Sequence, residues 1–376
     1  MVLSRRFVVL GGAGTIGRVV VRDLLDSHRR NRIVCADLDV GRASAIAGSL
    51  STRRVTAATA DVTKPAALTR LLRAATVVVN CTQHTHNLDV MRAALAARTH
   101  YVDLGGLFTW TRRQLSLHHE FEQRGLLAVP GMGCAPGITN VLARLAVDRL
   151  GRVEQLRIQV GGLDRNLPPG AFVFAYSPQT IVEELTLRPW IFSGGRFRTV
   201  SPRSGWELAR FPRPIGPCWI VRTRHSEIAT LPATFRRAGL RACDFKVSFD
   251  RSFVRMLMRR LRGGETLKAL AASGRRTGRP DDVEIARVVA ITPAVRGIRQ
   301  VLTVDCQARA RRAWAASAGD VDTAVPASIV AQMIASGEID ARGVIPPEVV
   351  VPVSPFLAQL RRRGLRIKTT LRTVKR

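Results

Sequence analysis

With 376 residues, of which 46% are hydrophobic, the chain is long enough for two folded domains and has the composition of a globular protein. Its net charge of +31 comes almost entirely from arginine spread along the whole length, without a helix-turn-helix, zinc-finger or aromatic RNA-binding pattern. Charge alone supports only salt-sensitive, non-specific association with polyanions, so we expect no specific nucleic-acid partner.

Membrane insertion, secretion and metal binding are not indicated either. No apolar stretch approaches the ~20 residues that span a bilayer, and the first expected strand begins too early for a signal peptide. We therefore expect no membrane partner and a cytoplasmic location. The six cysteines are scattered without a Cys-x-x-Cys pair or a histidine at ligand spacing, which predicts neither a disulfide framework nor a metal site.

A glycine motif lies in the stretch RRFVVLGGAGTIGRVVVRDLL, residues 5–25. The apolar run 7–10 predicts a strand buried on both faces, and the residues after the motif have helical periodicity. The glycines thus have G-x-G-x-x-G spacing on a strand-to-helix turn. There Gly12 permits the turn, Gly14 lets the backbone approach a pyrophosphate, and Gly17 lets the helix pack on the strand. The alternative is an α/β turn that binds no nucleotide.

An acidic residue follows at the spacing of a nucleotide site. Residues 33–36 predict a second strand that ends in Asp37, where a carboxylate would accept from the adenosine ribose hydroxyls. Because that charge repels a 2′-phosphate, we expect NAD, with NADP possible since Arg42 lies close in sequence. The expected cofactor-binding residues are Gly12, Gly14, Thr15, Ile16, Gly17, Asp37, Asp61, Cys81 and Thr82.

Strands and helices alternate onward from this motif. Further strands are expected at residues 55–59, 76–80, 101–104 and 126–129, and helices at 64–74, 88–97 and 112–124. Six strands alternating with helices are typical of a doubly wound dinucleotide-binding fold.

The pattern changes beyond residue 150. Residues 155–160 alternate like a strand of a partly exposed sheet, and 180–187 predict a helix. Residues 283–292 and 299–308 indicate a pair of strands, as in an open-faced α+β domain. A helical pattern returns from residue 313.

Seven motifs occur in one order along the chain: GGAGTIG, DVTKPAALTRLLRAATVVVNCT, THYVDLGG, PGMGCAPGITNVLA, YSPQTIVEE, RHSEIATLP and VDTAVPASIVAQMIASGEIDARGVIPPE. With them the chain resembles the saccharopine dehydrogenase-like family of nicotinamide oxidoreductases, most nearly the bacterial lysine 6-dehydrogenase type. The resemblance covers nearly the whole chain.

The resemblance implies an α/β fold with three parts. An N-terminal Rossmann domain with a doubly wound parallel sheet is expected over residues 1–140, and a second α+β substrate domain over 141–312. A C-terminal helical segment, 313–376, is expected to return and pack on the first domain.

The resemblance also implies an activity. Members of the family transfer hydride at a carbon next to nitrogen, so we expect an NAD(P)-dependent oxidoreductase acting on a CH–NH or CH–NH2 group. The expected partners are a small amino acid or amine substrate and a second copy in a homodimer. Two alternatives remain open: a carboxynorspermidine- or opine-type reductase that condenses an amine with an oxo acid, and a non-catalytic nucleotide-binding regulator.

The chemistry requires a base, because an amine loses hydride only when it is neutral. His225 is the first candidate for this base, with Arg224 or Arg222 as a fork for a substrate carboxylate. Cys134 lies at the expected start of a helix, whose dipole would lower a thiol pKa. Asp103 ends the fifth strand at the expected ligand edge.

Three further residues are candidates for binding substrate or cofactor. Tyr176 is a candidate substrate contact, and His84 and His86, after the fourth strand, are candidates for the nicotinamide pocket. Every candidate has a structural alternative, such as a buried histidine, a small residue in a tight turn or a capping carboxylate.

Overall fold

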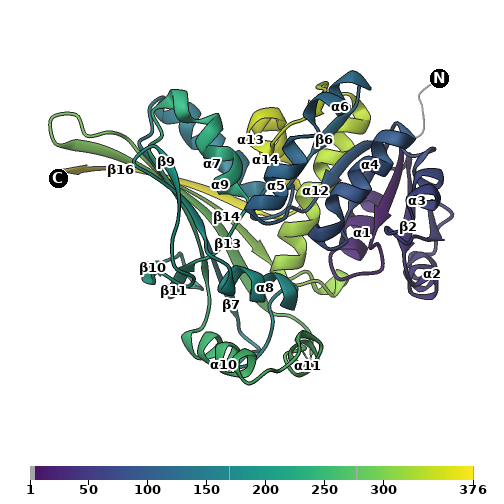
Figure 1. Ribbon diagram of the computed structural model, residues 1–376, viewed down its shortest axis with the longest axis horizontal. Helices are drawn as coiled ribbons and strands as arrows, with labels where there is room; N and C mark the ends of the chain where they lie inside the picture. The colour runs from purple at the N-terminus through teal and green to yellow at the C-terminus, as the bar shows by residue number, and fades with distance from the viewer. Residues whose placement is uncertain (1–4, 169, 277, 376) are drawn as a thin grey trace. The chain divides into compact units, whose positions relative to one another are not determined.

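The computed structural model describes residues 5–168, 170–276 and 278–375. They divide into two compact units. The first unit comprises the residues up to 144 together with 320–364, and the second comprises 145–319 and the residues from 365 onward. Figure 1 shows the ribbon of both and labels many of their elements.

The first unit is built on a parallel sheet of seven strands in the order β15-β6-β5-β4-β1-β2-β3. The strands are β1 (Arg5–Leu10), β2 (Asn31–Asp37), β3 (Val55–Thr59), β4 (Val77–Asn80), β5 (His100–Asp103), β6 (Leu127–Val129) and β15 (Gly343–Val344). This order confirms the predicted doubly wound sheet. It places the topological switch point between β1 and β4, where such sheets bind ligands.

Helices connect these strands in the first unit. They are α1 (Gly17–Ser27), α2 (Val40–Ser49), α3 (Pro65–Leu72), η1 (His84–His86), α4 (Asn87–Ala97), α5 (Phe108–Leu115), α6 (His118–Gln123), α7 (Ile138–Leu150), α12 (Ala318–Ser336), α13 (Pro347–Val350) and α14 (Val353–Arg362). The chain passes between the units within α7, near the start of α12 and after α14, between residues 364 and 365.

The core of the first unit follows from its apolar strands. Phe7, Val8, Val9 and Leu10 of β1 are fully buried, as expected of a strand covered on both faces. Side chains of β1, β2 and β4 pack with α3 and α4 in one apolar cluster. The predicted first-unit strands are therefore confirmed to within two residues at their ends.

The helix predicted at residues 112–124 is wrong as one element, because it divides into α5 and α6. At the division the Ser116 hydroxyl donates to the carbonyl of Arg113, 2.7 Å away. A serine that bonds to the backbone in this way competes with continuation of the helix.

The second unit contains a mixed sheet with the main order β10-β11-β12-β7-β13-β14-β16, to which β8 and β9 are attached beside β12. Its strands are β7 (Gln155–Asp164), β8 (Trp190–Ser193), β9 (Arg196–Thr199), β10 (Glu207–Arg210), β11 (Pro217–Arg222), β12 (Ala242–Ser248), β13 (Asp282–Ile291), β14 (Ile298–Arg309) and β16 (Arg366–Lys375). The predicted α+β character of this part is confirmed.

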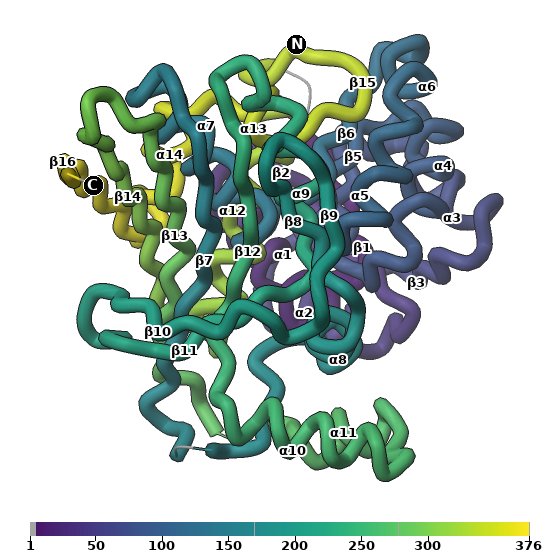
Figure 2. Tube along the Cα trace, turned by 60° about the vertical axis from the view of Figure 1, so that its left-hand side comes forward, coloured from purple at the N-terminus to yellow at the C-terminus, as the bar shows by residue number. Residues whose placement is uncertain are grey.

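The helices of the second unit are α8 (Pro178–Thr186), α9 (Glu227–Thr234), α10 (Arg251–Arg262) and α11 (Leu267–Ser273), with 3-10 turns η2 (Arg236–Ala238) and η3 (Arg312–Trp314). Figure 2 shows α10 and α11 side by side at one end of the strands. Phe253, Val254 and Leu257 of α10 pack with α8 and α11 in a second apolar cluster.

The expectation of a wholly helical C-terminal segment is wrong for its last residues. Residues 366–375 form β16, which pairs antiparallel with β14 along ten residues. Isoleucine, threonine and valine recur in this stretch, and β-branched residues favour strands.

Among the residues described, none of the helices combines the length and the apolar character that crossing a membrane requires.

Candidate functional site

The glycine motif forms the turn between β1 and α1, and two of its glycines are required by packing. A Cβ on Gly12 would lie 2.8 Å from the Cys35 sulfur, and a Cβ on Gly17 would lie 2.1 Å from the carbonyl oxygen of Gly11. Real Cβ atoms do not approach that closely. Gly12 and Gly17 therefore let the turn and the helix pack against the strands, as predicted.

Gly14 differs from Gly12 and Gly17 because the space that its side chain would occupy is mostly empty. A Cβ there would meet only the Gly11 oxygen, at 3.1 Å, so protein atoms leave the other directions free. Among the described residues, no acceptor is present for the backbone N–H groups of Thr15, Ile16 and Gly17. Free N–H groups at a helix start bind phosphate, so this loop fits a pyrophosphate.

A pocket of about 300 Å³ adjoins the loop, and its lining consists of Ala13, Thr15, Arg18, Arg42, Ala45 and Ile46. The Arg42 guanidinium donates to the carbonyl of Ala13 at 2.9 Å. The volume is at the lower end for small-molecule sites, and the two arginines make the pocket positively charged.

Asp37 lies at the end of β2, beside the loop. Its carboxylate accepts from the N–H of Ala13 at 3.0 Å and from that of Asp39 at 3.2 Å. Among the residues described, the lining of the pocket does not include Asp37. Its carboxylate thus has a structural role in holding the loop, and ribose binding by it remains a prediction.

The other expected cofactor residues lie after β3 and β4. Cys81 donates its N–H to the Leu10 carbonyl at 2.9 Å, which places it beside the glycine loop, and the Thr82 hydroxyl donates to Asn80 at 2.7 Å. Burial raises the pKa of the Cys81 thiol, which stays neutral. Asp61 is different, because its side chain accepts from the N–H and hydroxyl of Thr63, which lower its pKa.

Asp103 is buried and fully hydrogen-bonded. One oxygen accepts from the N–H groups of Gly105 and Gly131, both at 2.7 Å, and the other from the Tyr101 hydroxyl at 2.8 Å and the Gln114 amide. Burial raises the pKa of Asp103 although these bonds oppose the rise. Because each oxygen already accepts two bonds, the carboxylate holds the turns at 105 and 131, and this geometry does not support the predicted catalytic role.

The remaining first-unit candidates lie in loops next to β4 and α7. Cys134 is buried in the turn before α7, where its carbonyl accepts from the N–H of Thr139 at 3.1 Å. His84 is buried in η1 and meets the ring of Trp110 edge-on, with 6.1 Å between ring centroids. His86 is partly exposed. Their functional roles remain predictions.

In the second unit, His225 lies at the centre of a buried acid–base cluster. Its Nδ1 bonds to the carboxylate of Glu227, the first residue of α9. Its Nε2 lies 3.7 Å from a carboxylate oxygen of Glu184 on α8, and its ring stacks on Phe245 of β12 at 3.7 Å between centroids. The Tyr176 hydroxyl donates to the other oxygen of Glu184 at 2.6 Å. The exposed fraction of both glutamates is 2% or less.

Burial and charge shift the pKa values in this cluster. Burial raises the pKa of Glu184 to about 7, against the opposing influence of His225 and Tyr176. Burial lowers the pKa of His225, but the charge and hydrogen bond of Glu227 and the charge of Glu184 outweigh it, so the net shift is upward. The pKa of Glu184 thus lies near neutral pH, where general acid–base catalysis is most effective, and the pKa of its neighbour His225 is shifted upward.

The segment around His225 carries buried polar groups that lack partners. No described residue forms a hydrogen bond with the hydroxyls of Thr223 and Ser226 or with Nε of Arg224. Such groups are costly unless a ligand or water satisfies them. Arg222 differs, because its Nε donates to Asp244 at 2.9 Å. Of the two predicted carboxylate-binding arginines, Arg224 is therefore the one whose Nε–H is buried without a described hydrogen-bond partner.

Two family models match this chain. The saccharopine dehydrogenase NADP binding domain matches residues 7–129, and the saccharopine dehydrogenase C-terminal domain matches residues 133–365. The chain belongs to the saccharopine dehydrogenase family. The match confirms the predicted resemblance and the nicotinamide dinucleotide as cofactor class, whereas the preference for NAD over NADP remains a prediction.

Two similar proteins have low sequence identity to this chain. The carboxyaminopropylagmatine dehydrogenase of Synechocystis sp. is 23% identical over 265 residues, which cover 66% of this chain and 64% of that protein. The match thus spans less than two thirds of that relative. The saccharopine dehydrogenase (L-Glu forming) of Saccharomyces cerevisiae has the same fold, with a TM-score of 0.77 at 15% identity, over 97% of this chain and all of that one.

Sequence reasoning missed Glu184 and Glu227, the two carboxylates in the acid–base cluster of this chain. Glu184 and Glu227 were within the quoted motifs YSPQTIVEE and RHSEIATLP, but no residue spacing indicated that α8 brings Glu184 to His225. One signal could have indicated a partner for His225: Glu227 lies only two residues after it in the sequence. The structure does bring the predicted Tyr176 and His225 together, through Glu184.

Proposed function

We propose that the chain is a nicotinamide-dependent oxidoreductase that acts on a carbon bonded to nitrogen in an amino acid or related amine. The observation that carries this proposal is the buried His225 between Glu184 and Glu227. Family membership and the dehydrogenase name of the Synechocystis relative support it.

The first unit would hold the dinucleotide. The N–H groups of Thr15, Ile16 and Gly17 are the proposed donors to the pyrophosphate, and Gly14 leaves the space beside them open. When bound, the cofactor supplies hydride transfer at its nicotinamide ring, and the protein supplies orientation and proton transfer.

His225 would handle the substrate proton. Glu227 accepts from Nδ1–H, so the neutral ring has its lone pair on Nε2, on the side of Glu184. This nitrogen takes a proton from the substrate ammonium and leaves the neutral amine that can lose hydride. The imidazolium that forms is stabilised by both carboxylates, and in the reductive direction it returns the proton.

The unpartnered groups next to His225 would bind the rest of the substrate. Arg224 offers Nε–H to a carboxylate, and the hydroxyls of Thr223 and Ser226 can donate to the same group. Two buried carboxylates beside the histidine favour a positively charged amine. The combination fits a substrate that carries both charges, as an amino acid does.

The experiment is a turnover assay on the purified full chain. NAD and NADP are each offered with a panel of amino acids and diamines, NADH and NADPH are offered with the same panel with and without an oxo acid, and reduced cofactor is followed by absorbance. We expect reduction of the cofactor with an amine alone, and loss of it in His225→Asn. Oxidation of reduced cofactor only when an amine and an oxo acid are both present would instead favour a condensing reductase. Tight dinucleotide binding without turnover in any combination would refute the proposal. The expected homodimer is checked by light scattering on the same sample.

A further inference from the structure

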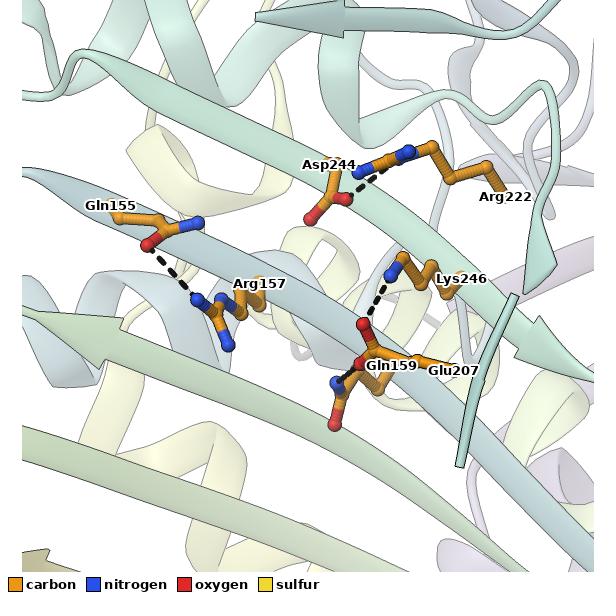
Figure 3. Close-up of a pocket in the computed structure, with 7 residues that line it drawn as sticks. All are labelled: Gln155, Arg157, Gln159, Glu207, Arg222, Asp244 and Lys246. Carbon is orange, nitrogen blue, oxygen red and sulfur yellow. Dashed lines mark hydrogen bonds and ion pairs between the residues drawn. The ribbon is translucent and has the colours of Figure 1, made fainter. Parts of the chain in front are cut away.

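A polar pocket of about 130 Å³ lies on the sheet of the second unit (Figure 3), and the residues discussed so far that line it are Arg222 and Asp244. Its lining consists of Gln155, Arg157, Gln159, Glu207, Arg222, Asp244 and Lys246. These side chains come from β7, β10, β11 and β12.

Strand register explains why these residues meet. Arg157 of β7 pairs with Asp244 of β12, Gln159 pairs with Lys246, and Arg222 of β11 also pairs with Lys246. Paired residues on neighbouring strands point to the same face of a sheet. The lining side chains therefore lie next to one another on one face of adjoining strands.

The pocket and the acid–base cluster lie on opposite faces of this sheet. Phe245, which stacks on His225, and Lys246, which lines the pocket, are consecutive residues of β12. Successive side chains of a strand point to opposite faces. A ligand of the pocket would thus not be the amine that His225 is proposed to deprotonate.

The charges of the pocket do not balance. Lys246 bonds to Glu207, whose other oxygen accepts from Gln159 at 3.2 Å, and Arg222 pairs with Asp244. These two ion pairs leave Arg157, whose only partner among the described residues is the amide oxygen of Gln155 at 3.4 Å. The pocket therefore has three cations and two carboxylates, a net charge of +1.

Donors are also in excess. A guanidinium has five N–H groups arranged as a fork for carboxylate or phosphate. In Figure 3 one dashed line ends on Arg157 and one on Arg222. Gly205 has φ +68°, and a Cβ there would lie 2.2 Å from a terminal nitrogen of Arg222. A glycine thus makes room for this guanidinium at the wall of the pocket.

We propose that this pocket binds the carboxylate or phosphate group of a small anionic molecule through Arg157 and Arg222. The volume admits a compact group and excludes a dinucleotide. The bound anion would supply a negatively charged partner for Arg157.

The test is calorimetric titration of the full chain with inorganic phosphate and, separately, with acetate, at constant ionic strength. We expect at least one probe to show a saturable site that Arg157→Gln weakens, in addition to any binding of phosphate at the glycine loop or of acetate beside Arg224. Phosphate binding without acetate binding identifies a phosphate-bearing ligand, and the reverse identifies a carboxylate. The measurement does not involve turnover, so its result is independent of the proposed oxidoreductase activity.

Variants separate this site from general attraction to a chain of charge +31. Arg157→Gln should weaken binding about tenfold, the usual loss for a hydrogen bond to a charged group, whereas Arg157→Lys, which keeps the charge but not the fork, should lose less. Arg255→Gln, which removes the same charge from the exposed face of α10, is the matched control and should bind like wild type. Absence of saturation for both probes, or equal weakening by Arg157→Gln and Arg255→Gln with all proteins folded, would overturn the proposal.

Discussion

The open side of Gly14 leads to a quantitative prediction for Gly14→Val. The added side chain would occupy the space beside the N–H groups of Thr15, Ile16 and Gly17, which have no acceptor among the described residues. A hydrogen bond to a charged group contributes about 1.5–3 kcal/mol. If two of the three hydrogen bonds to the pyrophosphate are lost, binding becomes less favourable by about 3–6 kcal/mol, which raises Kd roughly 10²–10⁴-fold.

The fold should survive this substitution. The new Cβ meets one protein atom, the Gly11 oxygen at 3.1 Å, and Gly14 has no positive φ, so we expect a stability change within about 1 kcal/mol. Gly17→Ala should behave in the opposite way, because its Cβ would lie 2.1 Å from the same oxygen. That variant should lose stability together with binding.

The assay is calorimetric titration of NADH and NADPH, with a melting curve for each protein. Gly48→Val is the matched control, since a Cβ at that position of α2 meets nothing within 4 Å. It should bind as wild type does. A folded Gly14→Val protein with unchanged affinity for both cofactors would show that the glycines serve only the turn and would refute the reasoning.

Three further predictions follow from the contacts of the two candidate sites. His225→Asn should reduce turnover by on the order of 10²-fold, as loss of a general base does, with little change in dinucleotide affinity. The check is steady-state kinetics across pH, together with melting curves of both proteins. If the fall of activity at acidic pH occurred at the same pH in the variant, His225 would not be the base. The pKa of His225 is lowered by burial, and Glu227 and Glu184 together outweigh this effect. In Glu227→Gln we therefore expect this pKa to fall and the acidic limb of activity to move to lower pH. A limb that stays in place would show that Glu227 does not set the pKa of the base. Asp37→Ser should raise the affinity for NADP relative to NAD, and Arg42→Ala should lower this relative affinity. Titration of each variant with both cofactors would measure the change. If the ratio of the two dissociation constants stayed as in wild type, neither residue would select the cofactor.

Sequence reasoning located the first sheet because its strands are continuous apolar runs. Residues such as Val77, Val78 and Val79 of β4 are fully buried, and a strand covered on both faces needs no alternation to be recognised. The glycine spacing located the phosphate loop for a similar reason, since Gly12 and Gly17 are fixed by contacts within the same turn and strand pair.

The parts that were missed depend on long-range contacts. Glu184 and His225 are 41 residues apart, and only the packing of α8 brings them within 3.7 Å. The pocket residues Arg157, Arg222 and Asp244 are separated in the same way. β16 was missed because charged and polar residues occur on both of its faces, as on many edge strands, so it lacks the apolar alternation that indicates a strand.

The position of β16 affects how the protein can be made. β14 has a partner on its outer side only after residues 366–375 have left the ribosome, long after the rest of that sheet has been synthesised. Until then β14 presents an open edge of backbone N–H and C=O groups, which is where strands from other chains attach and aggregation begins. A chain shortened at residue 365 would keep that edge permanently. Expression vectors that alter this end of the protein would therefore be expected to reduce the recovered yield more than vectors that alter the opposite end.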